Sequence, residues 1–513
     1  MKFLGCLILI LGVSVNAYGY TPFRGPSRYP SYGGSNENTN WNDSNQQWGN
    51  GWGNQNWGVQ NSNNSNWGNT RPSIPGNRPN VGLDTRVDVP GQDQGSSNGQ
   101  RKGPYGGDYI SSTSPFEIVY EWKMFDYDYP NPTERRAAIT SGEYIPENTM
   151  PLGIDAWQNR FFISAPRWKS GTPATLVYMD LPSREKGPIL KPYPNWSMHT
   201  TPTNPDCTKL MSVFRIQIDE CGRLWAIDAG MVNTTSKPNL VCPPKIVIFD
   251  LATDRVLLSH QIPDDIAKED TLYTGIQVDI RNGQCENAHA YVTDTWRSGL
   301  WVFSLAKRRS WRATNYLMLP NPHACEYSFH NQLTYQWTDG IFGIALGQID
   351  SRGDRLLYFH PMSSFYEFSV LTSVLQNETI WTEGINVNTQ FKAVGDRGAN
   401  SQSATSGIDR DGVLFYTLVN QDAVGCWDTN KVLVPNNLHH VDQHKVIMSF
   451  PNDIKVDKAP DQGVWVLANN LPLFLYTSLD YSQINVRILR ASTKTAVRDT
   501  VCDPKRTGSN IWG

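Results

Sequence analysis

The fold can be predicted from the stretch Ile216-Gln217-Ile218-Asp219, which is followed after four residues by Leu224-Trp225-Ala226-Ile227. An apolar strand ends at an aspartate, a turn follows, and a second apolar strand returns. Ile246-Val247-Ile248-Phe249 then supplies a third strand of β-branched and aromatic residues. The same order of strands, turn and aspartate recurs along the chain, which indicates a repeated β unit.

The spacing of the aspartates gives the period of this repeat. Asp155, Asp219 and Asp279 lie 64 and 60 residues apart, and Asp409 follows after 130 residues, which leaves space for one unit without the aspartate. Asp457 follows after a shorter interval of 48 residues. The six units begin at Gly153, Ile216, Ile276, Ile341, Gly407 and Ile454. A four-stranded blade with a long loop fits this period, so the sequence predicts an all-β, six-bladed β-propeller rather than a pair of β-sandwich domains.

Closure of a propeller requires one blade built from both ends of the chain. A strand-like run, Phe116 to Trp122, precedes the first unit, and Val486 to Arg490 follows the last one. We therefore expect these two runs to lie together in the last blade. The repeated aspartates are expected to bond the backbone of their own turns, and a ring of aspartates around a metal ion is the alternative.

The N-terminus has the features of a secretory signal peptide over residues 1–17. Lys2 precedes an apolar run, Phe3 to Val13, and Ala17 ends a site with small residues. The apolar run is shorter than the roughly 20 residues that span a bilayer, and no later run is long enough. The mature protein is therefore expected to be secreted and extracellular, without a membrane partner.

The cysteines and sequons fit an oxidising, extracellular compartment. Seven cysteines remain after removal of the signal peptide, so up to three disulfides are possible, with one cysteine left over. Glycosylation is predicted at Asn195, Asn233 and Asn377, each of which begins an Asn-x-Ser/Thr sequon.

Residues 18–112 are predicted to be a disordered, Asn/Gly/Trp-rich region. Residues 31–70 contain 13 Asn, 7 Gly and 5 Trp, and such a segment buries too little apolar surface to offset its ordering entropy. Its indoles could stack on an extracellular matrix or chitin-protein layer, and a low-complexity spacer is the alternative. The propeller is expected over residues 113–502, followed by a C-terminal tail over 503–513.

The charge balance excludes one class of partner. Lys and Arg number 45 against 48 Asp and Glu, for a formal net charge of −3. Binding to nucleic acid requires a basic surface, so no nucleic-acid partner is expected.

Several ordered motifs resemble the insect yellow and major royal jelly protein family. They are Arg223-Leu224-Trp225-Ala226-Ile227-Asp228-Ala229-Gly230 with the later Cys242-Pro243-Pro244-Lys245-Ile246-Val247-Ile248-Phe249-Asp250-Leu251, Leu357-Tyr358-Phe359-His360-Pro361, and Ala423-Val424-Gly425-Cys426-Trp427. The resemblance covers about Phe116 to Cys502. It implies a secreted six-bladed propeller that acts in cuticle or eggshell pigmentation and melanin formation, as a food protein, or as a salivary amine binder.

Site residues follow from the same resemblance. Some yellow-type proteins are associated with dopachrome conversion, for which a base must remove a carbon-bound proton, and His360 is the candidate. A buried histidine held by hydrogen bonds between blades is the alternative. The amine-binding relatives imply ligand contacts at Thr405 and Asn420. Asp422 replaces an aromatic residue expected nearby and could pair with an ammonium group, and plain structural roles are the alternative for all three.

The predicted function is therefore to bind or convert catechol or indole molecules derived from dopa or dopamine in the propeller channel. Small catechol or indole amines are the expected ligands, and no cofactor or metal is predicted. Whether the protein is an enzyme stays open at this point, and dopachrome conversion is the activity expected of an enzyme. A non-enzymatic structural component of cuticle or eggshell matrix is the alternative.

Overall fold

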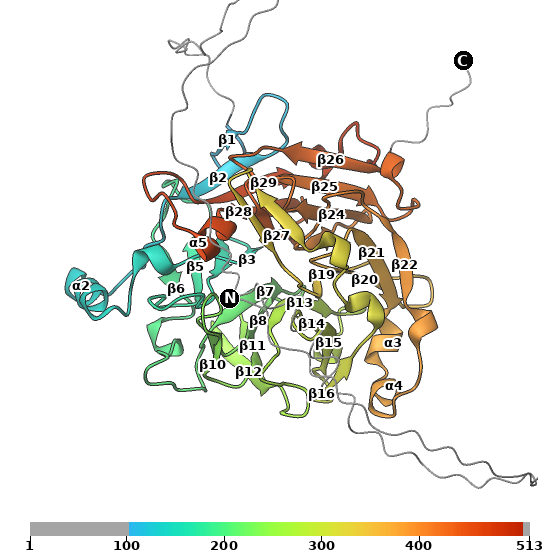
Figure 1. Cartoon of the computed structure of the whole chain (residues 1–513), viewed down its shortest axis with the longest axis horizontal. Coiled ribbons are helices and arrows are strands. Elements are labelled where there is room, and N and C mark those ends of the chain that lie inside the picture. Colours follow the sequence, from blue (N-terminus) through green and yellow to red (C-terminus); the bar gives the residue numbers. More distant parts are fainter. Residues whose placement is uncertain (1–101, 506–513) are drawn as a thin grey trace, which may run out of the picture. The chain divides into compact units, whose positions relative to one another are not determined.

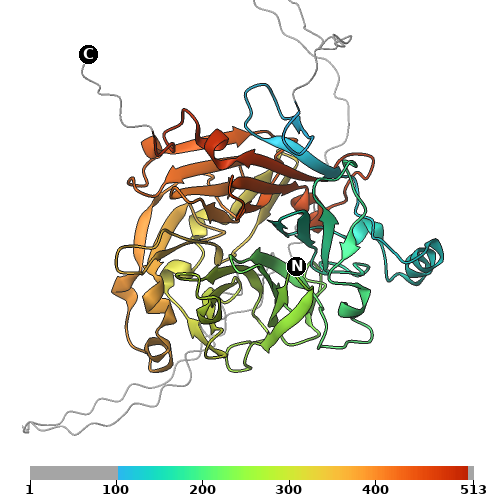
Figure 2. The same ribbon diagram turned by 180° about the vertical axis from the view of Figure 1, so that it is seen from behind.

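Six antiparallel sheets surround a common axis in the computed structural model, which describes residues 102–505 (Figure 1). The view from behind shows the same ring of sheets from its other face (Figure 2). The predicted all-β, six-bladed propeller is confirmed. The predicted signal peptide, most of the Asn/Gly/Trp-rich region (residues 18–101) and residues 506–513 of the tail lie outside the described residues.

Each of the first five blades is a sheet of four strands. Blade 1 contains β3 (Gly153–Trp157), β4 (Arg160–Ser164), β5 (Leu176–Asp180) and β6 (Lys191–Pro192). Blade 2 contains β7 (Val213–Ile218), β8 (Arg223–Asp228), β11 (Lys245–Asp250) and β12 (Arg255–Gln261). Blade 3 contains β13 (Tyr273–Asp279), β14 (His289–Asp294), β15 (Gly299–Ser304) and β16 (Arg309–Ala313). Blade 4 contains β19 (Ile341–Leu346), β20 (Leu356–Pro361), β21 (Tyr366–Leu371) and β22 (Lys392–Asp396). Blade 5 contains β23 (Ser406–Ile408), β24 (Val413–Leu418), β25 (Ala423–Asp428) and β26 (Leu438–Gln443).

The sixth blade joins the two ends of the propeller. Its strands are β27 (Pro451–Val456), β28 (Gly463–Asn469), β29 (Val486–Ser492), β2 (Glu117–Trp122) and the short β1 (Asp108–Tyr109). β2 pairs with β29 so that Ile118 faces Leu489 and Trp122 faces Val486. The predicted closure by both chain ends is therefore confirmed.

Residues 102–112 were expected to belong to the disordered region, and the structure packs them on the sixth blade. The ring of Tyr105 contacts Trp465 edge-on at 5.2 Å, and the Arg490 guanidinium lies 4.6 Å from the Tyr105 ring. β1 then pairs with β2. The aromatic anchor explains why the folded part begins before residue 113.

The first strand of each blade lines the axis. β3, β7, β13, β19, β23 and β27 are neighbours in that order, and β27 returns to β3, so the ring is closed. Large side chains fill the space between the sheets, among them the fully buried Trp225, Trp301, Trp427 and Trp465. These apolar contacts between blades hold the inner strands in place.

The repeated aspartates organise the turn that follows the inner strand. Asp219 Oδ1 accepts hydrogen bonds from the backbone N–H groups of Cys221 and Arg223, at 2.9 and 3.0 Å, and its Oδ2 accepts one from Trp225 Nε1 at 2.7 Å. Asp409 likewise accepts from two backbone N–H groups of its own turn. The predicted bonding of turn backbone is confirmed at these positions.

Helices and short hairpins are confined to the connections between strands. The helices are α2 (Pro132–Ser141), α3 (Thr372–Gln376), α4 (Glu378–Thr382), α5 (Leu471–Tyr476) and α6 (Thr493–Val497). The hairpins are β9 (Met231–Val232) with β10 (Asn239–Leu240), and β17 (Glu326–Phe329) with β18 (Leu333–Gln336). Within residues 102–505 no helix is long and apolar enough to cross a membrane.

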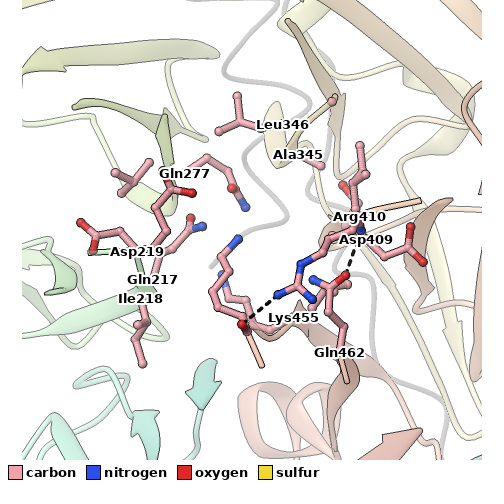
Figure 3. Close-up of a pocket in the computed structure, with 18 of the residues that line it drawn as sticks. Gln217, Ile218, Asp219, Gln277, Ala345, Leu346, Asp409, Arg410, Lys455 and Gln462 are labelled. Atoms are coloured by element: carbon pink, nitrogen blue, oxygen red, sulfur yellow. Dashed lines mark hydrogen bonds between the residues drawn. The ribbon is translucent and has the colours of Figure 1, made fainter. Parts of the chain in front are cut away.

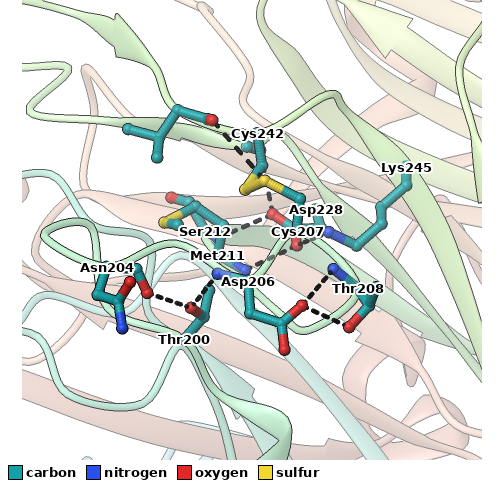
Figure 4. The surroundings of a disulfide bond; sticks show 12 residues. Thr200, Asn204, Asp206, Cys207, Thr208, Met211, Ser212, Asp228, Cys242 and Lys245 are labelled. Carbon is teal, nitrogen blue, oxygen red and sulfur yellow. Dashed lines mark hydrogen bonds and ion pairs between the residues drawn. A yellow bond between two sulfur atoms is a disulfide. The ribbon is translucent and has the colours of Figure 1, made fainter.

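Three disulfides link the described cysteines: Cys207–Cys242, Cys221–Cys285 and Cys426–Cys502. The first closes a loop above the buried ion pair of Lys245 Nζ and Asp228 Oδ2, which are 2.9 Å apart (Figure 4). Cys325 takes part in none of the three, and its buried thiol lies 3.4 Å from the carbonyl oxygen of Asn321. Three disulfides with one cysteine left over agree with the count from sequence.

Candidate functional site

A cavity of about 480 Å³ opens where the inner strands end, and all six of them contribute to its wall. Figure 3 shows Gln217 and Gln277 on one side of it and Asp409, Arg410 and Lys455 on the other. Small-molecule sites commonly measure about 300–1,000 Å³, so the size suits a small organic ligand. We call this space the polar cavity.

Polar side chains reach the polar cavity from equivalent positions of three blades. Gln217, Gln277 and Lys455 each lie two residues before the aspartate of their repeat. Gln217 is 7% exposed and Lys455 is 8% exposed, and Ser406 of β23 is 3% exposed. Because the blades are related by the repeat, residues far apart in sequence converge on one space.

Several of these groups have no partner within the protein. Gln217 Oε1 and Ser406 Oγ are buried without a hydrogen bond among the described residues. Between residues 102 and 505 the Lys455 ammonium forms neither a hydrogen bond nor an ion pair, although its charge acts on the nearby carboxyl of Asp155. A buried polar group without a partner costs about 1–3 kcal/mol, and such a group calls for a specific explanation. A ligand that supplies the partners is one.

Two carboxyl groups in the wall have pKa values suited to proton transfer. Asp155 accepts hydrogen bonds from the N–H groups of Ala156 and, across to blade 2, Ile218. Burial raises the pKa of Asp155 to about 6, against the opposing charge of Lys455. Burial likewise raises the pKa of Asp409 to about 6. A carboxyl of this pKa exchanges its proton close to neutral pH.

The two arginines of the wall are engaged elsewhere. Arg355 Nε donates to Asp279 Oδ1 at 2.8 Å. Arg410 donates to the carbonyl oxygens of Lys458, Ala459 and Pro460. Lys455 is therefore the buried cation of the wall whose donors are available to a ligand.

A second, smaller cavity of about 50 Å³ lies at the opposite ends of the inner strands. We call it the aromatic cavity, because its wall includes Trp168, Phe214, Trp337, Phe342 and Phe450. It is far below the usual size of a small-molecule site.

His360 lies on β20 and is not among the residues that line either cavity. Its Nδ1 is 2.9 Å from Glu367 Oε2, and the same oxygen accepts from Arg397 Nη1 at 2.6 Å. The ring is completely buried, and burial lowers the pKa of His360. These contacts resemble the structural alternative for His360 more than an open catalytic base.

Thr405, Asn420 and Asp422 make contacts within the protein and line neither cavity. Thr405 Oγ1 accepts from the N–H of Ile454 at 2.9 Å and so joins blade 5 to blade 6. Asn420 Oδ1 accepts from the N–H of Ser328 at 2.8 Å, and Asp422 Oδ2 lies 3.2 Å from His330 Nε2. Asn420 and Asp422 therefore hold the β17–β18 hairpin in place.

The predicted glycosylation sites differ in exposure. Asn195 and Asn377 are exposed, and Asn233 is half-buried. Asn195 uses its Oδ1 to accept from Ser197, which leaves its Nδ2 available. Glycosylation at all three stays a prediction.

The polar cavity residues were not singled out from the sequence, although a signal for them exists. Ile-Gln-Ile-Asp, Ile-Gln-Val-Asp and Ile-Lys-Val-Asp each carry one polar residue between apolar ones, at Gln217, Gln277 and Lys455. A polar side chain at the same place in three inner strands predicts a shared polar lining once the ring is known to close.

Comparison with known proteins agrees with this architecture. The family model described as major royal jelly protein matches residues 211–502, more than half of the chain. Dopaminechrome tautomerase of Drosophila melanogaster is 46% identical over 402 residues, which cover 77% of this chain and 86% of the relative. Protein yellow of Drosophila melanogaster is 37% identical over 401 residues, covering 77% and 71% of the two chains. Protein yellow of Drosophila subobscura is 38% identical over 417 residues, covering 79% and 71%. This chain belongs to the yellow and major royal jelly protein family.

Proposed function

We propose that this chain is a secreted, yellow-type protein that tautomerises indole quinones derived from dopamine or dopa, and that it thereby acts in melanin formation and cuticle pigmentation. The observation that carries the proposal is the 46% identity, over 77% of the chain, to a relative named dopaminechrome tautomerase. The polar cavity, with a volume of about 480 Å³ and two carboxyl groups of raised pKa, supports it as the reaction site.

The reaction class needs little from the protein. A base removes a proton from a ring carbon, the electron pair moves through the ring to a quinone oxygen, and that oxygen takes up a proton, so no oxidant or reductant is required. The carboxylate of Asp155 or Asp409 is the base in this proposal. A base with a pKa near 6 is largely ionised at neutral pH and still binds the proton that it removes.

Binding of an amine without chemistry, through Thr405, Asn420 and Asp422, has weaker support. The hydrogen bonds of these three side chains hold neighbouring strands and the β17–β18 hairpin. A purely structural role in cuticle or eggshell matrix, attached through residues 18–112, needs no cavity. It gives no account of the unpartnered buried groups at Gln217 and Ser406.

The test is the loss of dopaminechrome absorbance with purified, secreted protein, after subtraction of the spontaneous rate measured with boiled protein. The proposal expects a clear excess rate with native protein. The Asp155→Asn, Asp409→Asn double variant should lose most of that excess while it keeps its melting temperature within a few degrees. Equal rates for native and boiled protein would exclude the tautomerase function.

A further inference from the structure

We propose that Lys455, Gln217 and Ser406 form a binding site for two adjacent oxygen atoms on an aromatic ring, as found in catechols and o-quinones. The inference rests on the proposed function for the identity of its physiological ligand. The site itself is argued from the groups that the fold leaves without partners.

The three groups are buried, and they come from three separate blades. Gln217 lies on β7 of blade 2, Ser406 on β23 of blade 5 and Lys455 on β27 of blade 6. Each is more than nine-tenths buried, and each lines the polar cavity. Among the described residues Gln217 Oε1 and Ser406 Oγ lack any hydrogen bond. Three blades therefore present unsatisfied polar atoms to one enclosed space.

The chemistry of these groups matches an oxygen pair in either oxidation state. The Lys455 ammonium offers three donors, and the Gln217 amide and Ser406 hydroxyl each both donate and accept. Quinone oxygens accept hydrogen bonds, while catechol hydroxyls also donate them. A site with both donors and acceptors can therefore bind the quinone before tautomerisation and the diol after it.

The charge around the site argues against fully anionic ligands. Asp155, Asp219, Glu220 and Asp409 also line the polar cavity. A phosphate or dicarboxylate would approach these acidic groups with Lys455 as the available buried cation. A neutral ligand with two polar oxygens avoids this repulsion and still uses the ammonium group.

The position of Lys455 also suits the reaction. Its charge acts on Asp155, so the ammonium and the candidate base lie in the same part of the cavity. As the carbon-bound proton leaves, negative charge develops on a quinone oxygen. A fixed ammonium group beside that oxygen stabilises the charge where water is excluded.

Binding of catechol itself, kept reduced with ascorbate under nitrogen, tests the site without relying on turnover. Isothermal titration should show catechol bound by the native protein, with resorcinol, whose hydroxyls are not adjacent, at least tenfold weaker. Lys455→Gln should weaken catechol binding at least tenfold, and Ser406→Ala should weaken it severalfold. Lys445→Gln, at an exposed lysine close in sequence, is the matched control and should bind as the native protein does.

The outcomes separate the site from the proposed function. Catechol binding that depends on Lys455, with no dopaminechrome conversion, would keep the site and remove the tautomerase function. Conversion that Lys455→Gln leaves unchanged would remove the site and keep the function. No catechol binding to native protein, or equal affinity for catechol and resorcinol, would overturn the site. If Lys455→Gln does not fold, Ser406→Ala carries the test, and unchanged affinity in it would count against the site.

Discussion

Arg215 and Asp453 form a buried ion pair that reaches across the propeller channel, with Arg215 Nε 3.3 Å from Asp453 Oδ1. Arg215 belongs to blade 2 and Asp453 to blade 6, which are not neighbours in the ring. The guanidinium also donates to the carbonyl oxygen of Asn452 at 2.6 Å and lies 4.8 Å from the ring of Phe342 in blade 4. One side chain therefore connects three blades.

The pair also divides the channel. Arg215 lies two residues before Gln217 and Asp453 two residues before Lys455, so the ion pair is one strand repeat, roughly 6–7 Å, from the level of the polar cavity groups. Arg215 lines the aromatic cavity, whereas Gln217 and Lys455 line the polar cavity. The two cavities are thus separated by a layer of buried charge.

Removal of the arginine should strongly destabilise the propeller. Arg215→Met leaves the Asp453 carboxylate buried without its cation, which costs about 3–5 kcal/mol. Urea denaturation of single and double variants measures this loss. Arg215→Met with Asp453→Leu should recover a large part of it, because no unpaired charge remains. An Arg215→Met variant as stable as the native protein would contradict a structural role for the pair.

A surface ion pair supplies the comparison for that experiment. Lys191 Nζ lies 2.7 Å from Asp180 Oδ2, and both side chains are well exposed. Such pairs contribute about 0–1 kcal/mol. Lys191→Met should therefore shift the urea midpoint much less than Arg215→Met does.

The tautomerase rate should depend on pH through the raised carboxyl pKa values. Burial sets the pKa of Asp155 and of Asp409 to about 6, so both are largely protonated below that pH and ionised above it. A base must be ionised to accept a proton, so kcat/KM, corrected for the spontaneous reaction, should rise up to about pH 6 and then level off. Initial rates between pH 4.5 and 8 measure the profile, and a rate constant independent of pH from 5 to 7 would exclude these carboxyls as the base.

Gly343 should tolerate no side chain while His360 is present. The two residues pair across β19 and β20, and a Cβ built on Gly343 would overlap the His360 imidazole. Overpacking of this kind typically costs about 1–3 kcal/mol. Gly343→Ala should lower the melting temperature in the native background and have little effect in a His360→Ala background. Equal losses in both backgrounds would show that the two positions do not interact.

Lys455 should lower stability in the absence of ligand. Its buried ammonium has no hydrogen bond or ion pair among the residues that the structure describes, so Lys455→Met removes the cost of burying a charge. The melting temperature of this variant should equal or exceed that of the native protein, while its affinity for catechol falls. A large loss of stability would instead assign Lys455 to the architecture of blade 6. This trade of stability for binding is common at functional sites.

The sequence predicts most of the architecture because the repeat carries its own markers. Asp219 and Asp457 accept from Trp225 and Trp465 of the following strand, so aspartate and tryptophan keep a fixed spacing. The fourth unit, at Ile341, lacks the aspartate and was placed by the length that it had to fill. Connections such as the β17–β18 hairpin have no repeated pattern, and the sequence therefore gave no signal for them.

The site was harder to predict than the fold, because it depends on ring closure. Lys455 lies 238 residues after Gln217, and only the closed ring brings blades 2 and 6 to the same cavity. His360 stands in a family motif, yet its partner Glu367 is a near neighbour in the same blade. A motif alone does not distinguish a side chain that faces a cavity from one that packs between strands.

The most direct test of the account is a crystal structure of the protein soaked with 4-methylcatechol under reducing conditions. The account predicts electron density for the ligand in the polar cavity, with one of its oxygens within hydrogen-bond distance of Lys455 Nζ. Density for the ligand in the aromatic cavity alone, with the polar cavity containing only solvent, would contradict it.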